Sequence, residues 1–267
     1  MKAIILAAGR GQRLRPLTDH IPKCLIPIEG APILEHMLYR IDWCGLKDVV
    51  LVTGFEADCI RRYVTRLGVD GLRVEFVFNE RFAETNNLYS LWLALRDNAG
   101  PVTIFNADDY FNVHILEALE NTSADSAAVI DFTRPLPSDA MKTHVDGSRV
   151  TFLGKTLPEQ FASGNAIGMY RFSARTANLL RDEIGRRVRD GRVNDFYTAA
   201  ISDLASRVPI HAVSTEGLTW GEVDDHEDLA AAPSKFARIL AEERSVNSRI
   251  PAAPAWAPYV SQFQPTL

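Results

Sequence analysis

Apolar and polar positions alternate in two distinct patterns along the first half of the chain. Short apolar runs of strand length recur at residues 3–6, 48–53, 73–78, 102–106 and 127–132. Amphipathic stretches with helical spacing lie between them, at residues 32–43, 57–67, 84–93 and 113–121. Strands that alternate with helices in this order predict an α/β fold built on a parallel sheet with helices on both faces.

The pattern changes after residue 132. Residues 134–157 carry prolines, short alternating runs and the hairpin-turn signal Asp146-Gly147-Ser148, which predicts a small antiparallel insert forming one wall of a site. The later elements are expected as strands at 165–172 and 210–214 and helices at 173–190, 194–206 and 226–243. Residues 246–267 contain four prolines and little periodicity, which predicts an extended arm or a disordered tail.

Composition narrows the class of protein. A chain of 267 residues is long enough for one large α/β domain or two small ones, and its net charge of −5 argues against a general binder of nucleic acid or anionic membranes. No apolar run approaches the roughly 18 residues of a membrane span, and the N-terminus does not resemble a signal peptide. The three cysteines show no metal-ligand spacing. We expect a cytoplasmic protein with reduced thiols and no histidine-built zinc site.

The first loop carries the strongest candidate chemistry. The strand at 3–6 runs into a segment with two glycines, Gly9 and Gly11, and three arginines, Arg10, Arg13 and Arg15. Glycine lets backbone N–H groups approach an anion closely, and arginine adds fork-shaped donors that match phosphate oxygens. The segment therefore predicts a polyphosphate cradle, with a solvated surface turn as the alternative.

Lys23 lies in a rigid frame. It follows Pro22, and Pro27 comes shortly after it, so the segment is held extended at a fixed distance from the glycine loop. Two interpretations stay open: an exposed lysine, or a cation that faces the same ligand as the arginines. Likewise, Thr85 and Asn86 either cap the helix that follows them or offer amide groups to a ligand at the mouth of the sheet.

Acidic residues follow two later strands. Asp108 and Asp109 come just after the strand at 102–106, where open α/β sheets bind ligands, so one of them is a candidate Mg²⁺ ligand. The alternative is a solvated turn. Glu222 and Asp224 are two residues apart, so on extended backbone both side chains point to one face, as a metal site would need. Either Asp224 or Asp225 could instead cap the next helix.

Common nucleotide-binding signatures are absent. The glycine loop matches only the first part of a dinucleotide fingerprint, because Leu14 stands at the third glycine position. The P-loop pattern and the protein-kinase signature set are also missing. The remaining parts are a glycine–arginine loop, a rigid lysine and two acidic clusters. They are what a protein needs to bind a nucleoside triphosphate with Mg²⁺ and act on its phosphates.

These residues resemble the nucleotide-diphospho-sugar pyrophosphorylase superfamily of nucleotidyltransferases. The resemblance is carried by three motifs: Leu6-Ala7-Ala8-Gly9-Arg10-Gly11-Gln12-Arg13-Leu14, Pro22-Lys23-Cys24-Leu25 and Asn106-Ala107-Asp108. Asn86-Asn87-Leu88-Tyr89-Ser90 and Trp220-Gly221-Glu222-Val223-Asp224-Asp225 are similar to the branch that contains phosphocholine and 2-aminoethylphosphonate cytidylyltransferases. No hexapeptide repeats are present, so no appended β-helix is expected.

The resemblance implies a fold and a set of roles. The fold is a single Rossmann-like, mixed but mainly parallel sheet, the glycosyltransferase-A-like nucleotidyltransferase fold. A domain over 1–245 would comprise a nucleotide-binding half (1–112) and an acceptor-binding half (113–245), followed by the tail at 246–267. The implied catalytic residues are Lys23 and Arg13. The implied metal ligands are Asp108, Glu222 and Asp224. The implied nucleotide-binding residues are Leu6, Ala7, Ala8, Gly9, Arg10, Gly11, Asn86, Asn87, Ser90 and Ala107. The implied acceptor-binding residues are Lys155, Gly164, Asn165, Asp195 and Tyr197, with Asp195, Phe196 and Tyr197 receiving a cationic head group.

The expected activity is a Mg²⁺-dependent transfer of CMP from CTP to a small phosphate or phosphonate acceptor, with release of pyrophosphate. Two alternatives remain: a sugar-1-phosphate nucleotidyltransferase that uses UTP or dTTP, and a non-catalytic nucleotide-sensing module. The expected partners are the nucleoside triphosphate and the acceptor, without nucleic acid or membrane. The oligomeric state, a homodimer included, stays open.

Overall fold

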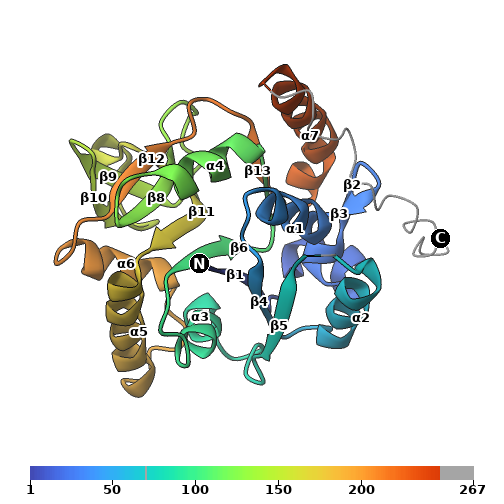
Figure 1. Ribbon diagram of the computed structural model, residues 1–267, viewed down its shortest axis with the longest axis horizontal. Helices are drawn as coiled ribbons and strands as arrows, with labels where there is room; N and C mark the ends of the chain where they lie inside the picture. Colours follow the sequence, from blue (N-terminus) through green and yellow to red (C-terminus); the bar gives the residue numbers. More distant parts are fainter. Residues whose placement is uncertain (70, 247–267) are drawn as a thin grey trace.

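A nine-stranded mixed sheet forms the centre of the computed structural model, which describes residues 1–69 and 71–246 (Figure 1). The strand order is β5-β4-β1-β6-β11-β8-β12-β10-β9. The first four strands in this order pair in parallel: β5 (Arg73–Phe78), β4 (Asp48–Thr53), β1 (Lys2–Ala7) and β6 (Val102–Asn106). Their carboxyl ends meet at one edge, where ligands of open α/β sheets bind.

The second half of the sheet is mixed. Its strands are β8 (Ser126–Asp131), β9 (Lys142–Asp146), β10 (Arg149–Leu153), β11 (Gly164–Phe172) and β12 (His211–Ser214). The long strand β11 runs antiparallel between β6 and β8, while β12 runs parallel to β8. The predicted antiparallel insert is confirmed, because β9 and β10 form a hairpin around the Asp146-Gly147-Ser148 turn.

Helices cover both faces of the sheet, as predicted. They are α1 (Ile33–Trp43), α2 (Ala57–Leu67), α3 (Asn87–Leu95), α4 (Val113–Asn121), α5 (Ala174–Arg189) and α6 (Tyr197–Ala205). Successive side chains of β1 point to opposite faces, as a strand requires. Ala3 and Ile5 join the core beneath α1, α2 and α4, whereas Ile4 joins the core beneath α3, α5 and α6. The predicted helix at 194–206 begins only at Tyr197.

Two short antiparallel pairs lie outside the main sheet. One joins β2 (Pro27–Ile28) to β3 (Ala31–Pro32), and the other joins β7 (Asp109–Phe111) to β13 (Trp220–Glu222). Short 3₁₀ turns cover Gln12–Leu14, Leu17–Asp19, Lys23–Leu25 and Glu159–Phe161. The β7–β13 pair brings the two predicted acidic clusters together, since Glu222 lies opposite Asp109 in the register.

The last described helix, α7 (His226–Val246), is anchored to the first half of the chain. Phe236 of α7 packs into a third core cluster with Leu14 and Tyr110. Glu243 accepts two hydrogen bonds from the buried Arg40 guanidinium, at 3.1 and 3.0 Å, and a third from the backbone N–H of Val113 at 2.7 Å. Helix α7 is therefore part of the folded domain. The predicted tail lies, beyond Val246, outside the described residues.

Within residues 1–69 and 71–246, no helix combines the length and apolar character that a membrane span would need.

Candidate active site

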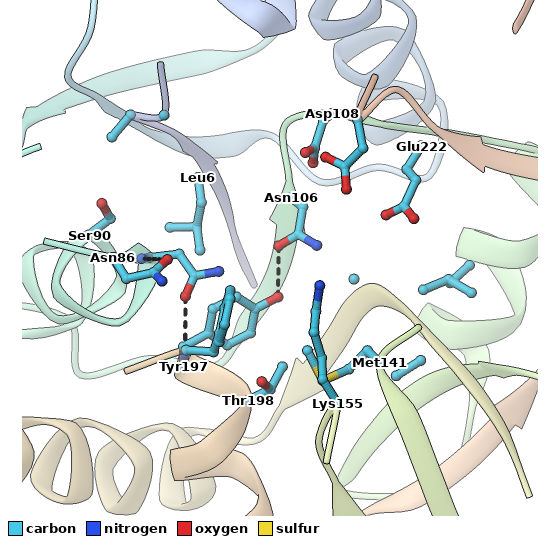
Figure 2. A pocket seen from close by; sticks show the side chains of 18 of the residues that line it. Leu6, Asn86, Ser90, Asn106, Asp108, Met141, Lys155, Tyr197, Thr198 and Glu222 are labelled. Carbon is cyan, nitrogen blue, oxygen red and sulfur yellow. Dashed lines mark hydrogen bonds between the residues drawn. The ribbon is translucent and has the colours of Figure 1, made fainter. Parts of the chain in front are cut away.

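A cavity of about 340 Å³ opens at the carboxyl ends of the parallel strands (Figure 2). One wall follows β1, β5 and β6, and includes Gly9, Asn79 and Asp108. The opposite wall comes from the β9–β10 insert and β11, and includes Lys155 and Asn165. The expectation that the insert forms one wall of the site is thus met.

Most of the predicted site residues converge on this cavity. Its lining includes Leu6, Ala8, Gly9, Arg13, Asn86, Asn87, Ser90, Asp108, Lys155, Asn165, Tyr197, Glu222 and Asp224. A smaller pocket of about 60 Å³ shares Leu6, Gly9 and Asp108 with it and adds Ala7, Lys23 and Ala107. The two pockets are neighbours, so residues more than 200 positions apart in the sequence surround one site.

The glycine loop holds a fixed shape. Gly11 has φ of +60°, and a Cβ on it would lie 3.1 Å from the Cβ of Lys23 and 3.2 Å from Thr18. The Thr18 hydroxyl also donates a 2.7 Å hydrogen bond to the Gly11 carbonyl. Only glycine fits this position without strain, because the left-handed conformation and the close neighbours both exclude a side chain. Gly9, by contrast, has open space around it and faces the cavity.

Four charged side chains are joined in one network beside the loop. Lys23 Nζ donates to Asp108 Oδ2 at 2.6 Å and to Asp224 Oδ1 at 2.5 Å. Arg13 Nη2 lies 2.6 Å from the other oxygen, Asp224 Oδ2, while Arg13 Nη1 lies 3.8 Å from Asp139. Charge-assisted bonds of this length are stronger than neutral ones. We call Arg13, Lys23, Asp108 and Asp224 the phosphate end of the cavity.

The pKa values of this network follow from its pairing. Burial disfavours the charged form of Lys23, but Asp108 and Asp224 outweigh it, so the pKa of Lys23 is raised. Burial raises the pKa of Asp224, but Lys23 and Arg13 outweigh it and lower that pKa below its usual range. Glu222 differs: burial, followed by the charges of Asp224 and Asp108, raises its pKa to about 7. The charges of Asp108 and Asp224 therefore act on Glu222, while Lys23 and Arg13 keep Asp224 ionised.

The side chains of the neighbouring residues Asp108 and Asp109 lie in different environments. Asp108 lines the cavity, whereas Asp109 is buried in β7. Burial, with the charges of Asp108 and Glu222, raises the pKa of Asp109 well above its usual range. A Cβ on Gly168 would lie 2.3 Å from Asp109 Oδ2. The β11 backbone therefore closes over Asp109 and leaves Asp108 as the accessible carboxylate.

The opposite part of the cavity is built from neutral hydrogen bonds. Asn87 Oδ1 accepts from the backbone N–H of Tyr197 at 3.1 Å, and the Tyr197 hydroxyl donates to Asn106 Oδ1 at 2.8 Å (Figure 2). Asn86 Oδ1 accepts from the N–H of Asn87 at 2.8 Å, so Asn86 caps α3 and also lines the cavity. We call Asn86, Asn87, Asn106 and Tyr197 the amide end. The two interpretations of Asn86 are compatible.

Lys155 and Trp220 form the remaining walls. Lys155 extends into the cavity in Figure 2, and its Nζ lies 5.6 Å from the centroid of the Phe196 ring. The Trp220 indole N–H donates to Asp131 at 2.7 Å, and the Arg134 guanidinium lies 5.3 Å from the Trp220 ring centroid. The indole is thereby fixed in place, with Trp220 contributing to the lining.

Asp195 requires a correction. Its carboxylate lies 2.5 Å from Arg187 Nη1 and 2.8 Å from Arg192 Nη2, and it does not line the cavity. The charge expected to receive a cationic head group is already neutralised by two arginines. Phe196 and Tyr197 do line the cavity, but Tyr197 is only 1% exposed and packs edge-on against Tyr170. Its ring face is therefore not open to a cation.

Three other predicted residues, Arg10, Gly11 and Gly164, line neither pocket. The Arg10 guanidinium lies 5.9 and 5.8 Å from the ring centroids of Phe55 and Phe82. Gly164 packs so closely that a Cβ would lie 2.5 Å from the Asp131 carbonyl. Gly11 shapes the loop without lining it. These three positions support the site through packing.

Sequence reasoning also missed several lining residues. Asn79 follows β5 as Asp108 follows β6, so its place at the carboxyl edge was a usable signal. Asn106 is part of the Asn106-Ala107-Asp108 motif, but no role was predicted for it. Met141, Gly168 and Thr198 also line the cavity, and they come from the insert, β11 and α6, whose positions in space the local sequence does not reveal.

The carboxylates suit a magnesium ion that also binds phosphates. Among the described residues, no group of three or more His, Cys, Asp or Glu side chains is placed to hold a metal on its own. Mg²⁺, however, is usually bound by one or two carboxylates together with substrate phosphates and waters. Asp108 and Asp224 offer hard oxygen donors on either side of Lys23, which fits that donor set.

The chain has identifiable relatives. Choline-phosphate cytidylyltransferase of Streptococcus pneumoniae is 26% identical over 244 residues, which cover 91% of this chain and 100% of that protein. CMP-5'-(3-aminopropyl)phosphonate synthase of Streptomyces rubellomurinus is 28% identical over 265 residues, 93% of this chain but only 41% of that protein.

Solved structures support the fold. The CTP:phosphocholine cytidylyltransferase of Streptococcus pneumoniae superposes with a TM-score of 0.73 at 24% identity, covering 88% of this chain and 98% of that one. The inositol-1-phosphate CTP transferase of T. maritima gives 0.75 at 18% identity, covering 89% and 95%. The expected nucleotidyltransferase fold is confirmed. Residues 2–144, more than half of the chain, match the nucleotidyl transferase family model. The chain belongs to the nucleotidyl transferase family, and it is a nucleotidyltransferase.

Proposed function

We propose that the protein transfers CMP from CTP to a small phosphate or phosphonate acceptor in a Mg²⁺-dependent reaction that releases pyrophosphate. The observation that carries this proposal is the phosphate end, where Lys23 and Arg13 meet Asp108 and Asp224 in one cavity. Two cations that can bind phosphates, beside two carboxylates that can bind a metal, are the parts that nucleotidyl transfer needs.

The reaction requires two things of the protein: alignment of the acceptor with the α-phosphorus, and neutralisation of the phosphate charge. An oxygen of the acceptor attacks the α-phosphorus in line while the bond to pyrophosphate breaks. The acceptor phosphate or phosphonate is already anionic near neutral pH, so no general base is required. Lys23 and Arg13 hold the phosphates and neutralise charge that moves onto the leaving group. A Mg²⁺ ion held by Asp108 and Asp224, with Glu222 nearby, would supply further charge neutralisation.

The choice of CTP is supported by the relatives and by the amide end. The names of two relatives specify cytidylyl or CMP chemistry. Asn86, Asn87 and Ser90 line the wall beside Leu6, where their amide and hydroxyl groups can meet the polar edge of a base or a ribose. We assign this wall to the nucleotide, and residues 1–112 to the nucleotide-binding half.

The acceptor is proposed to bind against the wall from residues 113–245. Lys155 and Asn165 are the polar groups there, and Met141 and Trp220 add apolar surface. One ammonium group beside a hydrogen-bonding amide suits a phosphate or phosphonate group. The apolar surface would contact the remainder of a small acceptor.

A substrate matrix tests the proposal. CTP, UTP and dTTP are each combined with phosphocholine, 2-aminoethylphosphonate and glucose 1-phosphate, and pyrophosphate release is measured with the Lys23→Met variant as the control. We expect release with CTP and at least one of the first two acceptors, and loss of that signal in the variant. Release only with the sugar phosphate would reject the proposal in favour of a sugar nucleotidyltransferase. Calorimetric nucleotide binding without any turnover would instead indicate a sensing module.

A further inference from the structure

Asp224 binds both cations of the phosphate end at once. Its Oδ1 accepts from Lys23 and its Oδ2 pairs with Arg13, so each carboxylate oxygen holds a different cation. The side chains of Asp224 and Lys23 are only 17% and 14% exposed, so water screens this contact weakly. In the free protein, therefore, the groups that would bind phosphate are already occupied by a carboxylate.

A carboxylate resembles a phosphate in the bonds it makes. Both present anionic oxygens to ammonium and guanidinium donors at similar distances. Lys23, Arg13, Asp108 and Asp224 contribute two positive and two negative charges, so the network is neutral as it stands. A polyphosphate that displaces Asp224 from the cations would leave two largely buried carboxylates beside its own negative charge, which is unfavourable unless another cation arrives.

We propose that Asp224 is a built-in counter-ion that occupies, in the free protein, the place of nucleotide phosphate oxygens, and so restricts the site to nucleotide that arrives with a divalent cation. On binding, Lys23 and Arg13 pass from carboxylate to phosphate, and Asp108 and Asp224 pass from Lys23 and Arg13 to the divalent cation. None of the four protein charges is left unpaired in this exchange. The inference rests on the proposed function and adds to Asp224 a role in the absence of metal.

The proposal predicts that substitution of Asp224 increases the affinity for nucleotide in the absence of metal, whereas loss of an ordinary ligand-binding residue lowers affinity. Asp224→Asn keeps the shape of the side chain but releases Lys23 and Arg13. Without metal, the variant should bind nucleotide more tightly than the unmodified protein, although it should be impaired in turnover. A residue that served only as a metal ligand would affect metal-free nucleotide binding only through general repulsion of the phosphates, which does not depend on Lys23 and Arg13.

The first experiment measures CTP binding by isothermal calorimetry in the presence of EDTA. We expect Asp224→Asn to bind CTP at least about tenfold more tightly than the unmodified protein, since a close charge pair can contribute 1.4 kcal/mol or more. Asp139→Asn is the matched control, because Asp139 also lines the cavity and faces Arg13, but at 3.8 Å and with both side chains more than half exposed. That variant should stay within about twofold. Equal metal-free affinity of Asp224→Asn and the unmodified protein would overturn the proposal.

A double-mutant cycle separates sequestration of the cations from a general effect of negative charge. Asp224→Asn is introduced into a chain that also carries Arg13→Met and Lys23→Met, and metal-free CTP binding is measured again. If Asp224 acts by occupying the two cations, the tightening falls below about threefold in this background. A tightening of the same size in both backgrounds would show that Asp224 acts only through long-range repulsion, and would overturn the proposal.

A reciprocal test uses the metal alone. Lys23→Met removes the cation that Asp108 and Asp224 share, so it should increase the affinity for Mn²⁺, measured without nucleotide by electron paramagnetic resonance, by about tenfold. Unchanged Mn²⁺ affinity in this variant would contradict the exchange of partners. Thermal unfolding of each variant establishes that it is folded, and this metal-only test does not depend on the folding of Asp224→Asn.

The two levels of proposal fail in different ways. If the unmodified protein binds no CTP even with excess Mg²⁺, the proposed function is wrong. If it binds CTP with Mg²⁺ but Asp224→Asn shows no gain without metal, the proposed function stands and the counter-ion role is wrong.

Discussion

The phosphate end and the amide end of the cavity are organised differently. The phosphate end consists of four charged side chains that bind each other, from loops that follow β1, β6 and β13. The amide end consists of neutral groups in which the Tyr197 hydroxyl and backbone N–H join Asn106 to Asn87. Charged pairs can change partners when a charged ligand binds, whereas neutral hydrogen bonds between protein groups can persist. The comparison suggests that one end exchanges contacts during the reaction and the other holds its shape.

The largest expected effect is at the phosphate end. Lys23→Ala should lower kcat by about 10³-fold, because it removes the buried cation that we propose stabilises charge in the transition state. Steady-state kinetics measures the change, and thermal unfolding should show that the domain is still folded. Lys155→Ala is the control from the opposite wall, and is expected to raise the KM of the acceptor more than it lowers kcat. Near-normal turnover in Lys23→Ala would contradict the proposal that the phosphate end binds the nucleotide phosphates during the reaction.

A second effect concerns the contacts that anchor α7, the helix that begins two residues after Asp224. Glu243→Gln should reduce the free energy of unfolding by about 3 kcal/mol, because it leaves the buried Arg40 charge without its partner. Urea denaturation measures the loss. The exposed pair between Arg73 and Asp48 provides the control, and Asp48→Asn should change stability by no more than the experimental error. An equally small change in Glu243→Gln would show that α7 is held by its apolar contacts alone.

A third effect is a pH dependence on the same side of the molecule. Burial, and then the charge of Arg40, lower the pKa of His36 to about 4, although its bond to the Ile28 carbonyl acts in the opposite direction. Because the unfolded chain takes up this proton near pH 6.5, stability should fall by about 2 kcal/mol between pH 7 and pH 5. His36→Gln should remove most of this slope in urea titrations across that range. The same slope in both proteins would assign the pH dependence to other groups.

The smallest expected effect is at the amide end. Tyr197→Phe removes one neutral hydrogen bond to Asn106, two residues before Asp108, and should lower kcat/KM by roughly fivefold, or about 1 kcal/mol. Tyr170→Phe is a matched control, since the buried Tyr170 hydroxyl has no hydrogen-bond partner among the described residues. That variant should leave kcat/KM unchanged. Equal losses in both variants would mean that the rings, and not the Tyr197–Asn106 bond, matter.

The sequence predicted individual elements better than their arrangement. The bounds of β4, β5, β6, α2 and α4 agree with the expected ranges, because each has a clear period and a clear stop. The position of β11 between β6 and β8 could not be predicted, since strand order depends on pairing between segments far apart in the chain. Nothing in the residues of β11 specifies its neighbours.

The site shows the same limit at the level of side chains. Gly9, Lys23 and Asp108 were found because a loop, a rigid frame and a strand end each leave a local signal. Asp195 and Arg10 were misplaced because their partners are not part of the motifs that drew attention to them. Arg187 neutralises Asp195 from α5, and Phe55 and Phe82 hold Arg10 from two other loops. Residue type alone cannot show whether a charge is already paired.

The distance along the chain between Lys23 and Asp224 has a consequence for folding. These partners are 201 residues apart, and Arg40 and Glu243 are 203 apart. A chain still under synthesis that has emerged as far as β7 contains the glycine loop, Lys23 and Asp108, but it lacks the second carboxylate and α7. Contacts of such high sequence separation form late, because they require most of the chain to be in place. Binding of nucleotide together with a divalent cation, which would need both carboxylates, would therefore stabilise the finished protein more than its early folding intermediates.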